Sequence, residues 1–130
     1  MTSSPPAIDQ QITFLYTQDL EATTPFYEEV LRLKPVLEHT QCRVYRVTRD
    51  SFLGICFARA GRYVEPKGVV YTFVTSDVDG WHQWLSGHNL PELGQVKKGE
   101  VTHAFFVRDP NGYILEFQSF VTPEWPPVDR

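Results

Sequence analysis

The sequence predicts an α+β fold with two βαβββ modules in tandem, forming a curved mixed sheet around a cleft. The same order of elements occurs twice, over about residues 11–60 and 68–120: an alternating strand, an aspartate, a short helix and further strands. The segments 18–27 and 76–85 align, with Asp19 matching Asp77. One module has too few strands to cover its own apolar face. Two modules are therefore expected to share a core and leave a concavity between their sheets.

The elements of the first module follow from its residue types. Two segments after the first helix are rich in β-branched and aromatic residues, like the opening strand, and the three strands are residues 11–17, 42–48 and 52–58. A helix is expected to begin between residues 20 and 24, where Thr24 suits the N-cap and Pro25 the first helical position. Arg49-Asp50 marks the turn between the last two strands.

The second module repeats this order. Its strands are residues 69–75, 102–108 and 113–120. Its helix follows Asp77, and its apolar stripe is expected at Trp81, Trp84, Leu85 and His88, which fall at helical spacing. The segment 109–112, "DPNG", predicts the turn of the closing hairpin. Arg108-Asp109 matches Arg49-Asp50 of the first module at nearly the same spacing as the aspartates.

The composition suits one globular domain over residues 11–120. The chain has 130 residues, of which 42% are hydrophobic and 14% aromatic, enough for a real core. Residues 1–10 and 121–130 are rich in proline and lack periodicity, which predicts flexible tails. Trp125 is the exception, and we expect it to pack on the body of the chain or on a neighbouring subunit.

Charge and cysteine content exclude several classes of partner. The net charge is −4 without a basic cluster, so neither nucleic acid nor a membrane surface is expected to bind. No apolar run approaches the length of a membrane span, and the first residues lack the pattern of a signal peptide. Cys42 and Cys56 do not form a CxxC pair. These features predict a cytoplasmic protein with reduced thiols.

Three motifs occur in order along the chain: "DLE" at 19–21 with "FY" at 26–27, "DVD" at 77–79, and "DPNGYILE" at 109–116. With these motifs the chain resembles the vicinal oxygen chelate superfamily, which includes glyoxalase I, extradiol dioxygenases, fosfomycin resistance enzymes and bleomycin resistance proteins. The resemblance covers roughly residues 11–120 and implies the tandem fold. It does not decide the chemistry, because the superfamily holds both enzymes and binding proteins.

The resemblance implies four strand positions for the ligands of a catalytic metal, which fall at Ile12, Val70, Cys56 and Glu116. Only Glu116 has a hard oxygen donor, and Ile12 and Val70 have no lone pair to donate. The four histidines do not repeat at ligand spacing. The sequence therefore predicts no metal and no other cofactor.

Strand alternation predicts the wall of the cleft. Two residues of this wall could also have other roles. His103 is interpreted as a hydrogen-bonded wall residue, and Cys56 as a small buried hydrophobe. The candidate ligand-binding residues are Ile12, Phe14, Tyr16, Gly54, Cys56, Val70, Thr72, His103, Ile114, Glu116 and Gln118. They describe a largely apolar pocket with a few polar groups, as is typical of small-molecule sites. Each of the apolar ones could equally be ordinary core.

Glu116 decides between the functions. A carboxylate between apolar neighbours must be solvated, paired, metal-bound or protonated. The preferred hypothesis is a metal-free binding protein for a small apolar or aromatic molecule, similar to bleomycin resistance proteins. The alternative is a glyoxalase-type lyase or isomerase, or a dioxygenase-like enzyme, with Glu116 as general base and either no metal or one with unusual ligands. A third hypothesis is a chain whose cleft has become core. The resemblance also implies a homodimer.

Overall fold

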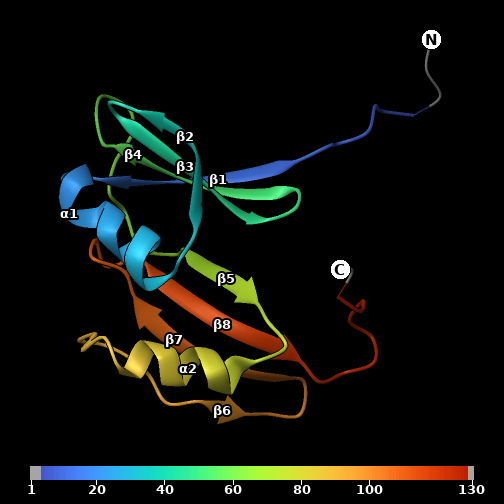
Figure 1. The fold of residues 1–130 in the computed structure, drawn as a ribbon. Coiled ribbons are helices and arrows are strands. Elements are labelled where there is room, and N and C mark those ends of the chain that lie inside the picture. Colours follow the sequence, from blue (N-terminus) through green and yellow to red (C-terminus); the bar gives the residue numbers. More distant parts are fainter. Residues whose placement is uncertain (1–3, 129–130) are drawn as a thin grey trace. The chain divides into compact units, whose positions relative to one another are not determined.

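The chain forms two compact units, with the boundary between Glu65 and Pro66 (Figure 1). The structure is a computed structural model, and it describes residues 4–128. Each unit contains one four-stranded mixed sheet, and each has the order βαβββ. The α+β class and the tandem modules predicted from the sequence are therefore confirmed.

The N-terminal unit has strand order β1-β4-β3-β2. Its first and last strands, β1 and β4, are parallel, and the remaining pairs are antiparallel. The elements are β1 (Gln11–Thr17), α1 (Leu20–Pro25), the π-helical turn η1 (Phe26–Val30), β2 (Lys34–His39), β3 (Cys42–Thr48) and β4 (Ser51–Phe57). Strand β2, which the sequence did not identify, is exposed along its whole length and lacks the alternating pattern of a half-buried strand.

Both units begin their helix with the same aspartate cap. Asp19 accepts a hydrogen bond of 3.1 Å from the backbone N–H of Ala22, and Asp77 accepts one of 2.9 Å from that of Gly80. Carboxylates are favoured at this position because they satisfy an N–H group that the helix leaves without a partner. The expected cap at Thr24 is therefore wrong, since the helix begins one turn earlier.

Pro25 is the last residue of α1 rather than its first. Proline has no N–H to donate within the helix. The next turn is wider than an α-turn, with the backbone N–H of Leu31 donating to the carbonyl of Phe26 over 2.9 Å. This π-helical turn buries Phe26 and Tyr27 against the sheet side of the unit.

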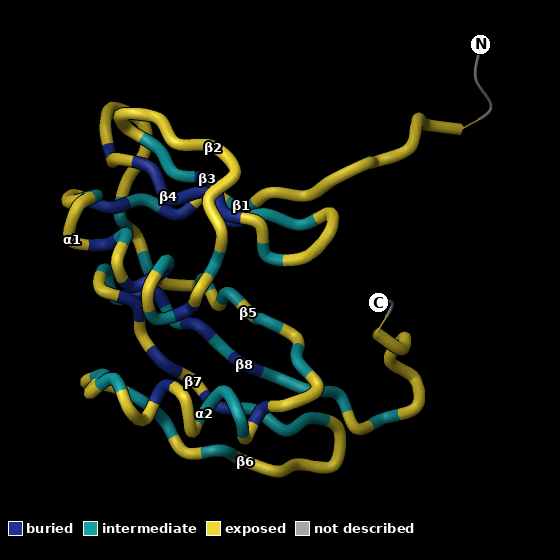
Figure 2. Tube along the Cα trace, in the orientation of Figure 1, coloured by how far each residue is buried: buried dark blue, intermediate teal, exposed yellow. Residues whose placement is uncertain are grey.

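Tyr45 of β3 anchors the core of the N-terminal unit. Its ring stacks on Tyr27 with centroids 6.0 Å apart, and its hydroxyl donates to the Glu28 carboxylate over 2.8 Å. Burial, and then the hydrogen bond and charge of Glu28, raise the pKa of the Tyr45 hydroxyl well above its usual value. The other buried apolar side chains of the unit include Leu15, Leu31, Leu53 and Ile55. The dark blue of buried residues in Figure 2 is prominent along β3 and β4.

The C-terminal unit has strand order β5-β8-β7-β6. Here too the outer pair, β5 and β8, is parallel, and the other pairs are antiparallel. The elements are β5 (Val70–Val74), α2 (Val78–Ser86), β6 (Lys97–Lys98), β7 (Thr102–Arg108) and β8 (Ile114–Phe120). Strand β6 has only two residues and was not predicted.

Helix α2 covers one face of this sheet. Val78 and Leu85 are buried, and Trp81 stacks on a ring of β8 with centroids 4.9 Å apart. Trp84 is 40% exposed and contacts His88 instead of the core. The expected stripe is therefore correct for Trp81 and Leu85 and wrong for Trp84 and His88, because the buried line of the helix continues through Val78.

The C-terminal segment contacts its own chain. The ring of Trp125 stacks on Phe120, the last residue of β8, with centroids 3.7 Å apart and planes 7° apart. Trp125 thus packs on the body of the chain, which is one of the two arrangements expected. Among residues 4–128, no helix is both long enough and apolar enough to cross a membrane.

Candidate functional site

The sheet of the N-terminal unit has an open face lined by aromatic and apolar side chains. Ile12, Phe14 and Tyr16 alternate along β1 on this face, and Phe14 is 44% exposed. The Phe14 ring lies directly over Gly54 of β4, where an added Cβ would be 2.5 Å from its Cδ1 atom. Gly54 therefore allows the ring to lie close to the sheet.

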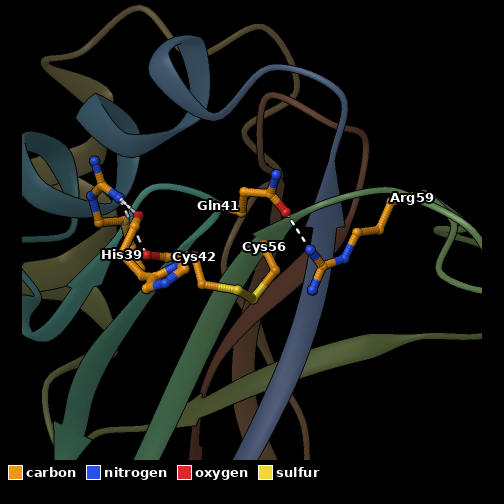
Figure 3. The surroundings of a disulfide bond; sticks show 6 residues. His39, Gln41, Cys42, Cys56 and Arg59 are labelled. Carbon is orange, nitrogen blue, oxygen red and sulfur yellow. Dashed lines mark hydrogen bonds between the residues drawn. A yellow bond between two sulfur atoms is a disulfide. The ribbon is translucent and has the colours of Figure 1, made fainter.

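One row of this face crosses all four strands in register. It consists of Tyr16 on β1, Cys56 on β4, Cys42 on β3 and His39 on β2. Cys42 and Cys56 form a disulfide bond (Figure 3). The expectation of two reduced thiols is therefore wrong, and Cys56 is half of a disulfide rather than a free buried thiol.

Strand geometry explains why these two cysteines meet. The backbone N–H of Phe57 donates to the carbonyl of Gln41 over 2.8 Å, one position along the ladder. Cys42 and Cys56 therefore occupy the next, non-hydrogen-bonded position, where antiparallel strands approach most closely. Their Cα atoms are 4.1 Å apart.

The open face encloses a hollow of about 340 Å³. Its walls combine aromatic, aliphatic and sulfur atoms with the cationic side chain of Arg62 and the ring of His39. The lining residues are Phe14, Tyr16, Leu37, His39, Cys42, Val44, Cys56 and Arg62. Three of the predicted site residues, Phe14, Tyr16 and Cys56, are brought together here.

In the C-terminal unit, Glu116 lies on the face of the sheet opposite α2. Thr72 of β5 donates its hydroxyl to one carboxylate oxygen over 2.8 Å, and the amide of Gln118 donates to the other over 3.2 Å. Glu116 is half-buried. Within the described part of this unit, no ion pair involves Glu116. Neutral donors therefore orient the carboxylate and leave its further lone pairs available.

A second hollow, of about 360 Å³, lies in the C-terminal unit. Val70, Phe106 and Ile114 form its apolar wall. At its edge Arg108 and Glu92 form an ion pair with a nitrogen–oxygen distance of 3.0 Å. Val70 and Ile114 were predicted site residues, whereas the pairing of Glu92 with Arg108 was not predicted.

The turn before β8 is organised by Asp109. This carboxylate is 5% exposed and accepts hydrogen bonds from the backbone N–H groups of Asn111 and Tyr113, over 2.8 and 2.9 Å. Gly112 has a φ of +89°, a conformation that strongly favours glycine. The "DPNG" turn is therefore a structural device that fixes where β8, and with it Glu116, begins.

His103 does not share the face of Glu116. Strand β7 pairs Phe106 with Glu116 and His103 with Ser119, which places His103 on the alternate face. The face that carries Glu116 also carries Thr72 and Gln118.

The structure corrects the residue of the first module that corresponds to Glu116. Counted back from the aspartate caps, Phe14 corresponds to Thr72. Phe14 pairs with Gly54, and Thr72 pairs with Glu116. Gly54, rather than Cys56, therefore corresponds to Glu116.

The residues present do not fit the divalent metal that the resemblance implies. Ile12 and Val70 offer no donor atom, Gly54 has no side chain, and the sulfur of Cys56 is bonded to Cys42. Among residues 4–128, no three His, Cys, Asp or Glu side chains are grouped as a metal site would require. Glu116 alone cannot supply the three or so protein ligands that such an ion needs.

Comparison with known proteins identifies the family. The sequence matches the Glyoxalase/Bleomycin resistance protein/Dioxygenase superfamily over residues 10–117. The chain belongs to this superfamily, as the motifs indicated. No curated protein gives a significant match to the sequence.

Solved structures share the fold at low sequence identity. A lactoylglutathione lyase from Agrobacterium tumefaciens has a TM-score of 0.72 at 23% identity, covering 88% of this chain and 95% of that one. A glyoxalase/bleomycin resistance protein/dioxygenase from Nocardioides has a TM-score of 0.75 at 17% identity, with coverages of 99% and 93%. TioX from Micromonospora sp. ML1 has a TM-score of 0.72 at 14% identity, with coverages of 86% and 98%.

Proposed function

We propose that this protein binds a small, largely apolar or aromatic molecule without a metal, in the manner of a bleomycin resistance protein. The observation that carries the proposal is the open face of the N-terminal sheet, where Phe14 remains 44% exposed beside a hollow of about 340 Å³. An aromatic ligand seated there would remove apolar surface from water, worth about 25 cal/mol per Å². A volume of this size suits a small molecule.

The C-terminal unit has a candidate polar contact of its own at Glu116. Thr72 and Gln118 hold its carboxylate in a fixed orientation without neutralising it. A carboxylate of this kind accepts hydrogen bonds from a donor group, such as an amine, amide or hydroxyl. A ligand that binds at this face of the C-terminal unit is therefore expected to carry at least one donor group.

A thermal-shift screen of planar aromatic compounds, followed by calorimetry on the hits, tests the proposal. Bound ligand raises the melting temperature because it binds the folded state only. Phe14→Ala should weaken binding at least about tenfold, which corresponds to about 1.4 kcal/mol. The control is Tyr63→Ala, an aromatic residue that is 72% exposed outside the hollow. A screen without hits, or equal losses for both variants, would refute the proposal.

Glu116→Gln tests the donor requirement. The amide preserves the shape of the side chain and its capacity to accept from Thr72, but removes the charge. A hit that carries a donor group should lose affinity, whereas its analogue without that group should not. Equal affinity of both compounds for both variants would return Glu116 to a purely structural role.

A lyase or isomerase with Glu116 as general base is the second candidate. It is favoured by the neutral partners of the carboxylate, which leave it able to accept a proton, and by the structural likeness to a lactoylglutathione lyase. Conversion of lactoylglutathione, followed by mass spectrometry and abolished by Glu116→Gln, would support this candidate over simple binding.

Metal analysis of the protein purified without chelator should show well under one equivalent of any divalent ion.

Assembly as a homodimer is part of the same proposal. It now rests on family likeness alone, because Trp125 already stacks within its own chain. Light scattering at micromolar concentration should give the mass of two chains, and the mass of one chain would refute it.

A further inference from the structure

The disulfide lines the hollow of the N-terminal unit instead of lying in the core. Cys42 and Cys56 are both wall residues of this 340 Å³ space. Cys42 is half-buried, whereas Cys56 is only 4% exposed. The two residues therefore differ in exposure, and Cys42 is the more exposed of the two toward a small molecule in the hollow.

The surroundings of the disulfide are cationic. Arg62 lines the hollow, and none of the residues lining it within 4–128 is an aspartate or a glutamate. Arg59 is held close to the cysteine row by a hydrogen bond to the side-chain oxygen of Gln41, the residue before Cys42 (Figure 3). Arg59 and Arg62 also exchange two backbone hydrogen bonds, with nitrogen–oxygen distances of 2.7 and 3.1 Å. Positive charge near the sulfur attracts anionic reactants and stabilises a departing thiolate.

The sheet keeps the two cysteines opposed whether or not they are bonded. Strand β4 pairs with β1 on one side and β3 on the other, each along nearly its full length. Strand β3 is also paired with β2. Opening the disulfide is therefore expected to leave the pairing of β3 with β4 in place. The two thiols then stay near enough to each other to form the disulfide again.

From these observations we propose that Cys42–Cys56 is a thiol–disulfide exchange site for small anionic thiols. The thiolate of the incoming molecule attacks Sγ of Cys42, a new S–S bond forms, and the Cys42–Cys56 bond breaks with its electron pair leaving on Cys56 as a thiolate. A second thiolate then attacks the incoming sulfur of the mixed disulfide. The small thiol leaves as its own disulfide, and Cys42 is released as a thiolate. Two small thiols are oxidised and the protein is reduced by two electrons.

The reaction uses the same hollow as the proposed ligand but does not depend on that ligand. It is therefore measured with no aromatic compound present. Failure of thiol exchange leaves the binding proposal intact, and failure of the compound screen leaves the exchange site intact.

Trapping the mixed disulfide tests which sulfur reacts. The oxidised protein is mixed with 2-mercaptoethanesulfonate, quenched in acid and mapped by peptide mass spectrometry. The adduct is expected on Cys42. A parallel measurement avoids dependence on a short-lived species: Cys56→Ser, treated with the disulfide of the same reagent, should form a stable adduct at Cys42, whereas Cys42→Ser should react much more slowly at Cys56. Equal reaction at both positions, or no opening of the disulfide in the folded protein, would overturn the proposal.

Charge selectivity tests the role of Arg62. Rates are compared per thiolate for 2-mercaptoethanesulfonate and for cysteamine, which carries an ammonium group. The anionic thiol is expected to react about three to ten times faster at low salt, with the preference reduced at high salt. Arg62→Gln should lose most of this preference. Arg49→Gln, the same change in the exposed turn between β3 and β4, should retain it. An equal preference in both variants, or none in the unaltered protein, would overturn the anionic selectivity.

Discussion

Phe14 pairs with Gly54 in the N-terminal sheet, and in the C-terminal sheet the corresponding pair is Thr72 with Glu116. The strand pairing is the same, but the chemistry is opposite. In the first unit, the missing side chain of glycine makes room for an aromatic ring. In the second, a carboxylate fills the position and takes a hydroxyl donor from its neighbour. At this pair of corresponding positions, one unit therefore has an apolar contact and the other a polar one.

The next row of each sheet shows the same contrast. Cys56 and Cys42 are covalently joined on β4 and β3, whereas the corresponding residues of β8 and β7 are Gln118 and Ala104. Gln118 turns its amide to Glu116 over 3.2 Å. The N-terminal face is therefore held by a crosslink and the C-terminal face by hydrogen bonds. The two units should therefore respond differently to matched substitutions.

Removing the crosslink should have the largest effect. The disulfide joins residues separated by 14 positions, and a loop of that length is worth about 3 kcal/mol through the unfolded chain. We expect the double variant Cys42→Ala, Cys56→Ala to lower the free energy of unfolding by about 2–3 kcal/mol. The control is Ala104→Ser with Gln118→Ala in the other sheet, which breaks no crosslink and should cost less.

The tryptophans make that experiment specific to a unit. All three, Trp81, Trp84 and Trp125, lie in the C-terminal unit. Their fluorescence reports the unfolding of that unit, while circular dichroism reports both. If the double cysteine variant and the unaltered protein have the same urea midpoint by fluorescence and by circular dichroism, the disulfide does not stabilise the N-terminal unit.

Asp109 and Asp50, which occupy matching positions in the two modules, should differ in how much they contribute to the free energy of unfolding. Asp109 is 5% exposed and accepts two backbone hydrogen bonds, whereas Asp50 is exposed and its carboxylate pairs with the neighbouring Arg49. Asp109→Ala leaves buried N–H groups without partners and should cost about 2 kcal/mol. Asp50→Ala should cost less than about 0.5 kcal/mol. Urea unfolding of both variants decides, and similar losses would contradict the assignment of the turn to Asp109.

Gly54→Ala should lower the free energy of unfolding by about 1.5 kcal/mol, less than Asp109→Ala does. The added methyl would meet the Phe14 ring, which must move outward. In a Phe14→Ala background the same change should be nearly neutral, because the obstacle is gone. Gly87→Ala provides the control, since its added Cβ would have no neighbour closer than 3.6 Å. A cost that persists without the Phe14 ring would place the strain in the backbone instead.

The fold could be predicted because its signals are local. Alternating strands, the aspartates before each helix and the "DPNG" turn each depend on a few consecutive residues. The first helix begins at Leu20, within the predicted range, but its cap was assigned to Thr24 instead of Asp19 because Thr24-Pro25 offers a second, competing start signal. The exposed strand β2 and the two-residue β6 carry no periodicity, so the sequence could not mark them.

The disulfide shows why the site was harder to predict than the fold. An ideal hairpin around Arg49-Asp50 would place Phe57 opposite Cys42. A β-bulge between Arg46 and Thr48 shifts the pairing by one residue, so that Cys56 faces Cys42 instead. The sequence contains both cysteines and the turn but gives no sign of the bulge. Thr72 and Gln118 were assigned to the same site as Glu116, but their hydrogen bonds to it were not predicted, since Thr72 reaches Glu116 through the parallel pairing of β5 with β8.

The smallest expected effect concerns one tyrosine in each unit, the buried Tyr45 and the half-buried Tyr71. Burial raises the pKa of Tyr71 to about 12, whereas Tyr45 also has the hydrogen bond and charge of Glu28 acting on it. Tyr45 therefore cannot be changed without stranding a partner. Tyr71 contacts Phe73 through its ring, with centroids 5.0 Å apart, so Tyr71→Phe removes only the hydroxyl.

The sign of the pH effect follows from proton binding. Below the ordinary tyrosine pKa of about 10, folded and unfolded chains both keep the Tyr71 proton, and stability does not depend on it. Above that value the unfolded chain loses the proton while the folded chain keeps it, so the free energy of unfolding falls as the pH rises. At a pH of about 10.5 we expect Tyr71→Phe to retain up to about 0.8 kcal/mol that the unaltered protein loses. Near pH 8 the two proteins should lose nothing by this route. Tyr63→Phe, an exposed tyrosine, should follow the unaltered protein at both pH values. Urea unfolding at each pH measures the difference, and an equal decline for Tyr71→Phe and Tyr63→Phe would show that burial does not hold the Tyr71 proton.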